Sequence, residues 1–465
     1  MQRLLFNSVR LRVINMKNIK NLFGLKINIR STLRGMTVVF LLLLVARLIG
    51  MIKELIVAYR YGVSPIIDGY LFVFNNVFLI STISESVMVF VLVPLILRWR
   101  ISRSSPRVIE FKGELLGVMA ISSLGTALIF VVVIPYMIRW EVFGLTAEAT
   151  EAALQAAWWL PYGLVPALLA TVVFAWAVAH ERHISSLGDA LPAIGIVTAV
   201  LCLPQPSITP LIVGTLVGFL LRYLFLAWID YKAGDYVWPR LRFRSELWRE
   251  FLQGMSMMMV AQSILVLTNL VDTFFAIRLG EGALATYNYA YRLIAVPLSL
   301  LSISVSRVII SFFSKINHSS ENVEQLMVFS WLVWWVLGIG GVIAGIGWLA
   351  SEVVVRLIYE RGAFTSEDTI VVTAVLRMLC LQFPVYMGWI VVFYWLASQL
   401  AYRTLFKAST LVLFTKILTA WVLSGFYGLA GLALSTTIMY LLGLGYTFMA
   451  AYISASTGGS NDRSS

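Results

Sequence analysis

The feature that most constrains this fold is a series of apolar runs, each about 20 residues or longer, separated by short polar stretches. A helix rises about 1.5 Å per residue, so a helix of about 20 residues crosses the hydrocarbon core of a bilayer with its backbone groups satisfied internally. Because 60% of the chain is hydrophobic and only 12% is charged, we expect an all-α polytopic membrane protein. The runs predict twelve transmembrane helices, at 36–58, 67–97, 114–138, 153–179, 186–204, 208–229, 250–277, 285–313, 326–350, 370–398, 408–425 and 429–453.

The charges of the loops predict how these helices are oriented. Loops 98–113 and 230–249 are rich in Lys and Arg, whereas loop 139–152 between them is mostly acidic. Basic loops stay on the cytoplasmic side, so we expect both termini in the cytoplasm. The basic segment 1–35 is expected to form a cytoplasmic tail that is attracted to anionic lipid. The net charge of +12 is spread over such segments rather than over a soluble basic domain, which argues against a nucleic-acid partner.

The chain repeats itself at an offset of about 218 residues, which predicts two six-helix lobes. Three pairs of short motifs recur in the same order: AYRYG (58–62) with AIRLG (276–280), TAEAT (146–150) with TSEDT (365–369), and FAW (174–176) with FYW (393–395). Since each half has an even number of spans, both enter the membrane from the same side, and their axis lies along the membrane normal. A cavity is then expected between the lobes. The alternative is a duplicated bundle that does not transport.

This repeat divides the chain into five parts. The predicted boundaries are a basic tail at 1–35, an N-terminal lobe at 36–230, a cytoplasmic linker at 231–249, a C-terminal lobe at 250–454 and a short polar tail at 455–465.

Several charged residues fall inside the apolar runs. A charge at the middle of a membrane costs about 2.5–3.5 kcal/mol on insertion scales, so these side chains must face a wet cavity or each other. The candidates are Arg47, Lys53, Glu54, Glu85, Asp272, Arg292, Arg307 and Lys416.

The positions and signs of these charges predict a cavity that binds an anion. Arg47, Gly50, Glu54 and Ala58 recur at helical spacing and share one face. Cations outnumber acids, and the guanidinium group of Arg matches phosphate geometry, so we expect Arg47, Lys53, Arg292 and Arg307 to bind a phosphate-bearing substrate. Glu54, Glu85 and Asp272 are expected to gate or to form ion pairs.

Other interpretations of single residues stay open. Arg47 and Glu54 could pair with each other and only fix helix packing. Lys53 could extend toward the membrane interface, and Arg222 could anchor the end of its span there. Glu85 could face the lumen or serve helix packing.

The sequence gives no sign of catalysis or of a cofactor. His180, His183 and His318 lie in loop-like sequence, and Cys202 and Cys380 lie in apolar stretches without metal-ligand spacing. No nucleophile–base pair or pair of catalytic carboxylates is in register, so we do not expect an enzyme, a metal site or a cofactor. The chain also has no GxxxxGK[ST] motif for ATP. Transport must then be driven by an ion gradient, the membrane potential or consumption of the product.

Three stretches resemble the MurJ (MviN) family of lipid flippases, part of the MOP flippase superfamily. They are NLVDTFFAIRLGEGALATYNYAYRLIAVPL (269–298), RLIYERGAFTSEDT (356–369), and ARLIGMIKELIVAYRYG with DGYLFVF (46–62 and 68–74). The resemblance implies an inner-membrane protein that moves undecaprenyl-diphosphate-linked saccharide across the bacterial inner membrane. Its partners would be this lipid-linked saccharide, membrane lipids and proteins of glycan assembly.

The resemblance also implies roles for single residues. Functional arginines of the family match Arg47, Lys53 and Arg292, and a family aspartate before the second helix matches Asp68, which adds Asp68 to the gating group. A further family arginine would fall near Ser81 or Thr82, where this chain has no cation.

Two more departures concern the substrate. The family motif EGAF is ESVM at 85–88, and twelve apolar runs stand where many members have fourteen helices. Lipid II and a lipid-linked unit of another polysaccharide therefore remain alternative substrates. The competing functions are an ion-coupled small-molecule antiporter of the multidrug exporter type and a non-transporting scaffold of a glycan assembly complex.

Overall fold

The computed structural model describes residues 29–102, 105–140, 144–203, 207–316, 322–398 and 402–456. Side chains within 29–40 and 300–329, and a few others, lie outside this description, as do most of the two predicted tails. The described residues form helices and contain no strand. Among them, nine helical segments are long and apolar enough to cross a membrane. The protein is therefore an all-helical, multi-pass membrane protein, as the apolar runs predict.

The helices of the N-terminal half follow the predicted runs and are often joined end to end. They are α2 (Ile29–Tyr61), α3 (Pro65–Val87), the π-helical turn η1 (Met88–Leu92), α4 (Val93–Ser102), α5 (Ser105–Arg139), α6 (Ala147–Trp159), the 3-10 segment η2 (Leu160–Gly163), α7 (Leu164–Ala179), the 3-10 segment η3 (His183–Ala190), α8 (Leu191–Cys202) and α9 (Thr209–Lys232). The turn η1 joins α3 to α4 in one candidate span, Pro65–Trp99, and η2 joins α6 to α7 in another, Ala147–Ala179.

The C-terminal half consists of fewer and longer helices. They are α10 (Leu247–Ile277), α11 (Ala283–Ile316), α12 (Asn322–Tyr359), α13 (Ser366–Cys380), α14 (Gln382–Ser398) and α15 (Tyr402–Ser456). Helix α15 is broken at Gly428, which has φ 56° and ψ −136°. Glycine adopts this conformation without the steric cost of a Cβ. A contact between Lys416 and Ser435, 19 residues apart, shows that the two arms of α15 lie side by side.

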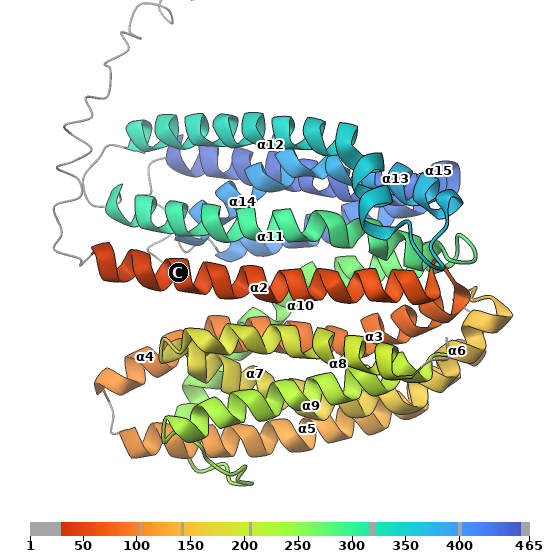
Figure 1. Ribbon diagram of the computed structural model, residues 1–465. Helices are drawn as coiled ribbons and strands as arrows, with labels where there is room; N and C mark the ends of the chain where they lie inside the picture. Colours follow the sequence, from red (N-terminus) through yellow and green to blue (C-terminus); the bar gives the residue numbers. More distant parts are fainter. Residues whose placement is uncertain are drawn as a thin grey trace, which may run out of the picture.

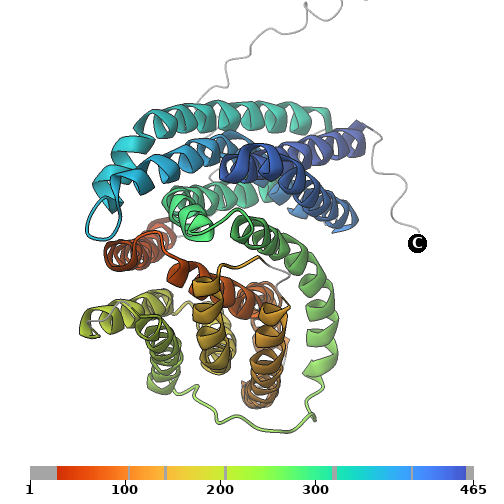
Figure 2. The ribbon, with the colours of Figure 1, turned by 90° about the vertical axis from the view of Figure 1, so that its right-hand side faces the viewer.

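The helices gather in two bundles (Figures 1 and 2). Helices α3 to α9 lie on one side and α11 to α15 on the other, and α2 runs between them in Figure 1. Helix α2 packs mainly on η3 and α8 and makes fewer contacts with α11 and α12. Helix α10 packs against α3 and also against α15. These two helices therefore border the space between the bundles.

At one end of the molecule, short loops hold the two bundles together. The Asp68 Oδ1 atom on α3 accepts a hydrogen bond of 2.7 Å from the backbone N–H of Ala285 on α11. The Tyr289 hydroxyl donates to the Gly62 carbonyl at 2.9 Å, and the Ala363 N–H donates to the Tyr59 carbonyl at 2.9 Å. We call this set of contacts the seal. It lies where α2 ends and α11 begins, at the right of Figure 1.

At the opposite end, the segment between α9 and α10 is bound to the N-terminal bundle. The Arg240 N–H donates to the Gly113 carbonyl of α5 at 2.8 Å, and the Glu114 carboxylate accepts from the backbone N–H groups of Arg244 and Ser245 at 3.3 Å. Lys112 forms an ion pair with Asp230 and is 1% exposed. The predicted loop 98–113 is therefore shorter than expected, because α5 begins at Ser105 and carries Lys112 into the bundle.

Candidate functional site: a charged cavity between the bundles

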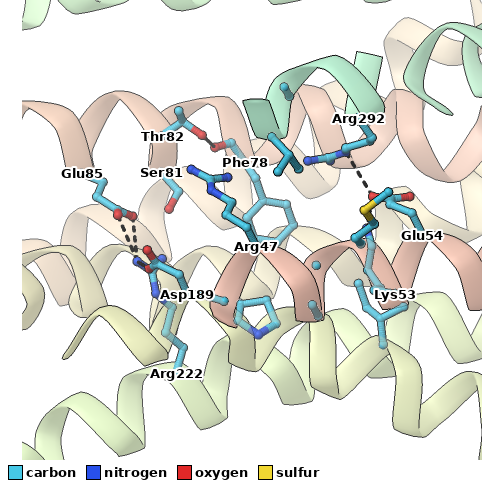
Figure 3. A pocket seen from close by; sticks show the side chains of 18 of the residues that line it. Arg47, Lys53, Glu54, Phe78, Ser81, Thr82, Glu85, Asp189, Arg222 and Arg292 are labelled. Carbon is cyan, nitrogen blue, oxygen red and sulfur yellow. Dashed lines mark hydrogen bonds and ion pairs between the residues drawn. The ribbon is translucent and has the colours of Figure 1, made fainter. Parts of the chain in front are cut away.

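A cavity of about 600 Å³ lies between the two bundles. Its walls come from α2, α3, the η3–α8 segment and α9 on one side, and from α11 and the end of α12 on the other (Figure 3). Its charged side chains are Arg47, Lys53, Glu54, Glu85, Asp189, Arg222 and Arg292. Four cations face three carboxylates, so the cavity carries a formal excess of positive charge.

The first group of charges joins the two bundles. The Glu54 Oε1 atom lies 2.6 Å from Lys53 Nζ and 3.1 Å from Arg292 Nε. Glu54 and Lys53 are adjacent on α2, whereas Arg292 comes from α11. The pairing uses Nε of Arg292, and its side chain remains 42% exposed, with the guanidinium end directed toward the Arg47 side of the cavity (Figure 3). Glu54 therefore holds two cations without covering either of them completely.

The second group lies within the N-terminal bundle, and the sequence predicted only part of it. One terminal nitrogen of Arg222 contacts both oxygens of Glu85 at 3.0 Å and Asp189 Oδ1 at 2.7 Å. We call these three residues the Arg222 cluster. The Arg222 side chain is 6% exposed, so the interpretation of this residue as an interfacial anchor is wrong. The sequence signal that could have indicated the pair of Arg222 and Glu85 is a basic and an acidic residue inside two predicted spans, because each needs a partner there. Asp189 gave the same signal, a carboxylate near the start of the predicted run 186–204, but it was not among the predicted site residues.

Arg47 lies between these two groups and projects into the cavity (Figure 3). Its side chain is exposed, and among the described residues no carboxylate lies within ion-pair distance of it. The alternative in which Arg47 pairs with Glu54 is therefore wrong, since Glu54 binds Lys53 and Arg292 instead. Arg47 is left as a guanidinium with its donors turned to the cavity.

Small and neutral residues fill the rest of the same wall. A Cβ added at Gly50 would have no atom within 4 Å, so this glycine faces open space rather than a packed helix. Ala58, two turns after Gly50 on the same face of α2, is fully buried and does not line the cavity. Ser81 and Thr82 line the cavity without any charge, as the sequence indicates for the position of the missing family arginine. Arg222 brings a guanidinium to this wall from α9 instead.

The remaining predicted site residues lie elsewhere. Asp68 is 2% exposed and belongs to the seal, not to the cavity wall. Asp272 and Lys416 pair with each other inside the C-terminal bundle, with Lys416 Nζ 2.5 Å from Asp272 Oδ1. Asp272 therefore pairs with a cation of its own half of the chain, whereas Glu54 pairs with Arg292 of the other half. The side chain of Arg307 lies outside the described residues.

The site has the chemistry of binding rather than of bond breaking. Guanidinium and ammonium groups offer several donors to an anion in a partly desolvated space, where such bonds are strong. In the described part of the chain, no grouping of three or more His, Cys, Asp or Glu residues could hold a metal ion.

An all-helical, multi-pass protein with a charged cavity between two bundles has the architecture of a secondary transporter. Solved structures have the same fold. A structure described as lipid II flippase MurJ in an inward closed conformation matches with a TM-score of 0.74 at 19% identity, over 90% of this chain and 89% of that one. An inward-facing MATE transporter of the MOP superfamily matches with a TM-score of 0.70 at 14% identity, over 90% and 98%.

The sequence narrows this class to a family. The family model "Lipid II flippase MurJ" matches residues 57–461, and the chain belongs to this family. Proteins named probable lipid II flippase MurJ match from Bdellovibrio bacteriovorus (27% identity, 36% of this chain, 32% of that protein), Buchnera aphidicola (20%, 75% and 70%) and Thermotoga maritima (27%, 59% and 56%). The chain thus spans about a third of the first of these relatives and over half of the other two. The resemblance noted in the sequence is confirmed, and the family is one of transporters rather than enzymes.

Proposed function

We propose that the chain is a flippase that moves an undecaprenyl-diphosphate-linked saccharide across the bacterial inner membrane. Membership of the MurJ family and the fold shared with MOP-superfamily transporters support this assignment. The proposal includes twelve spans in two repeated six-helix lobes, 36–230 and 250–454, with both termini in the cytoplasm. The seal then lies at the outer face, and the loop between α9 and α10 at the inner face.

One observation carries the proposal: cations from both bundles line one cavity. Arg47 and Lys53 come from α2 and Arg292 from α11. Glu54 bridges Lys53 and Arg292, and no described carboxylate pairs with Arg47. A diphosphate placed among them would accept hydrogen bonds from both bundles at once. Binding of the headgroup would therefore couple the two lobes, while the polyprenyl chain would remain in lipid.

The seal gives this proposal a direction. Tyr359 lines the cavity and donates a hydrogen bond of 3.3 Å to the Tyr289 carbonyl within the seal, so the seal closes the cavity at the Lys53 end. Glu85 lies 17 residues beyond Asp68 along α3, which is about 25 Å at 1.5 Å per residue. The headgroup would enter from the Glu85 end, bind, and leave outward once the seal opens and the opposite end closes.

The composition of the cavity also bears on the alternatives. An antiporter of cationic drugs needs a cavity dominated by acids, whereas here two of the three carboxylates are already bound by Arg222. The Arg222 cluster stands where the family arginine near Ser81 is absent, so we keep both lipid II and another lipid-linked glycan as substrates.

Complementation tests the proposal and separates it from a scaffold role. Cells depleted of their own lipid II flippase are given the wild-type chain, the Arg292→Ala variant or the Lys407→Ala variant. Lys407 is an exposed lysine on α15 outside the cavity and serves as the control. A lipid II flippase rescues growth with the wild type and Lys407→Ala but not with Arg292→Ala. Equal rescue by all three contradicts the role of Arg292 in holding the headgroup. Failure of all three at normal membrane levels contradicts lipid II as the substrate.

A further inference from the structure

The C-terminal bundle contains a second charged site that the cavity does not use. Lys416, on the first arm of α15, is fully buried, and its side chain is 0% exposed. Its Nζ atom lies 2.5 Å from Asp272 Oδ1 on α10, 2.9 Å from Ser435 Oγ and 2.6 Å from Thr436 Oγ1 on the second arm. We call these four residues the Lys416 site. None of them lines the cavity between the bundles.

The ammonium group of Lys416 is saturated by this arrangement. An ammonium has three N–H donors and no acceptor, and here three oxygen atoms surround it: two hydroxyl oxygens that accept hydrogen bonds and one carboxylate oxygen in an ion pair. No donor is left for a substrate or for a water that would connect the site to the cavity. Lys416 therefore does not serve the anion cavity, although its position inside an apolar run suggested that it would face a lumen.

The oxygen atoms around Nζ are arranged as acceptors for a cation. Ser435 donates its own hydroxyl proton to the Leu432 carbonyl at 2.6 Å, so the lone pairs of its oxygen are turned toward Nζ. Asp272 supplies the negative charge, and Thr436 adds a second hydroxyl oxygen. Carboxylate and hydroxyl oxygens are the kind of ligand that hard cations prefer, and here three of them surround one buried position.

We infer that the Lys416 site is a monovalent-cation site whose occupant is the chain's own ammonium group. The lysine ties α10 to both arms of α15 in the way a bound alkali ion would, but it cannot dissociate. This site therefore binds no free Na⁺ or K⁺ in the wild-type chain, and a gradient of these ions cannot drive transport through it. The inference concerns the C-terminal bundle alone and holds whichever substrate the cavity takes.

Cation-dependent stability of the purified full-length chain in detergent tests the inference. Lys416→Ala removes the ammonium and leaves Asp272, Ser435 and Thr436 around a vacancy. Thermal unfolding is followed in NaCl, KCl and choline chloride at equal ionic strength. A ligand that binds only the folded state raises the unfolding temperature with concentration. We expect Lys416→Ala to unfold at a lower temperature in choline chloride and to regain several degrees, saturably, in NaCl or KCl.

The controls separate a cation site from a general effect of salt. The wild type and Lys407→Ala should show the same unfolding temperature in all three salts, and the wild type should bind no radioactive Na⁺. In the double variant Asp272→Asn/Lys416→Ala the saturable response should disappear. Saturable Na⁺ or K⁺ binding by the wild type overturns the inference. So does a Lys416→Ala protein that gains nothing from either ion, or that cannot be recovered folded in either salt.

Discussion

The seal is the feature whose removal should change the protein most clearly without touching the cavity. Asp68 is 2% exposed, and its carboxylate accepts the N–H of Ala285 at 2.7 Å at the start of α11. Asp68→Ala deletes this acceptor and leaves both bundles otherwise intact. The substitution should destabilise only the sealed state, because the hydrogen bond between Asp68 and Ala285 forms only when the two bundles touch at this end.

The structure sets the size of the effect. A hydrogen bond to a charged group contributes about 1.5–3 kcal/mol when it is lost from a buried site. At about 1.36 kcal/mol for each factor of ten, the ratio of sealed to unsealed molecules should fall by about 10- to 150-fold. Asp68→Asn keeps one oxygen acceptor without the charge, so its effect should be smaller than that of Asp68→Ala.

Access to a cysteine in the cavity measures this ratio. The cavity residue Gly50 is replaced by Cys in a chain whose own Cys202 and Cys380 are replaced by Ser. A membrane-impermeant maleimide is added to the outer face of cells. With Asp68→Ala, labelling from outside should become at least several-fold faster than with the intact seal.

A matched carboxylate controls for local helix effects. Asp368 accepts the N–H of Thr365 at 2.8 Å and caps α13, so it stabilises a helix start without joining the bundles. Asp368→Asn should leave outside labelling unchanged. If Asp68→Ala also leaves it unchanged in folded protein, the seal does not close the outer face and the reasoning is refuted.

Two further predictions concern the cavity. Gly50→Leu should fill open space in the cavity and abolish transport, while the unfolding temperature stays near that of the wild type. The control Gly125→Leu, which also faces open space but lies on α5 away from the cavity, should transport normally. Equal activity of both variants would show that the substrate does not pass Gly50. Arg222→Ala leaves two carboxylates without a partner and should lower the free energy of unfolding by about 3 kcal/mol. This is the lower end of the range for broken buried ion pairs, because Glu85 and Asp189 are 28% and 37% exposed. Adding Glu85→Gln and Asp189→Asn should restore most of the loss in chemical unfolding, and a loss that persists would place the role of Arg222 outside this cluster.

Much of the fold could be predicted because apolar length is a strong signal. The lipid core fixes the length of each helix, so runs such as 36–58 and 114–138 indicate α2 and α5 directly. The break at Gly428 also follows from the sequence, because two runs meet there with little polar sequence between them. Helix ends were less certain, and Lys112 shows why. A charge near the end of a run reads as a loop residue when its buried partner, here Asp230, is distant in sequence.

The cavity was predictable only in part. The cost of a buried charge predicts that Arg47, Lys53 and Arg292 must find water or partners, and all three line one cavity. For a single residue, however, the cost of burying its charge is the same whether the residue faces a cavity or forms an ion pair, so its surroundings could not be predicted. Lys416 and Arg222 depend on contacts between helices far apart in the chain, which periodicity along one helix cannot give.

The most direct test of the account is the affinity of the purified chain for undecaprenyl diphosphate compared with the uncharged undecaprenol. If Arg47, Lys53 and Arg292 hold the anionic headgroup, the diphosphate should bind at least tenfold more tightly, and the Arg47→Ala/Arg292→Ala double variant should lose most of this preference. The preference should also weaken as the salt concentration rises. Equal affinity for the two lipids, or a double variant that binds the diphosphate as the wild type does, would contradict the claim that the cavity recognises the charge of its substrate.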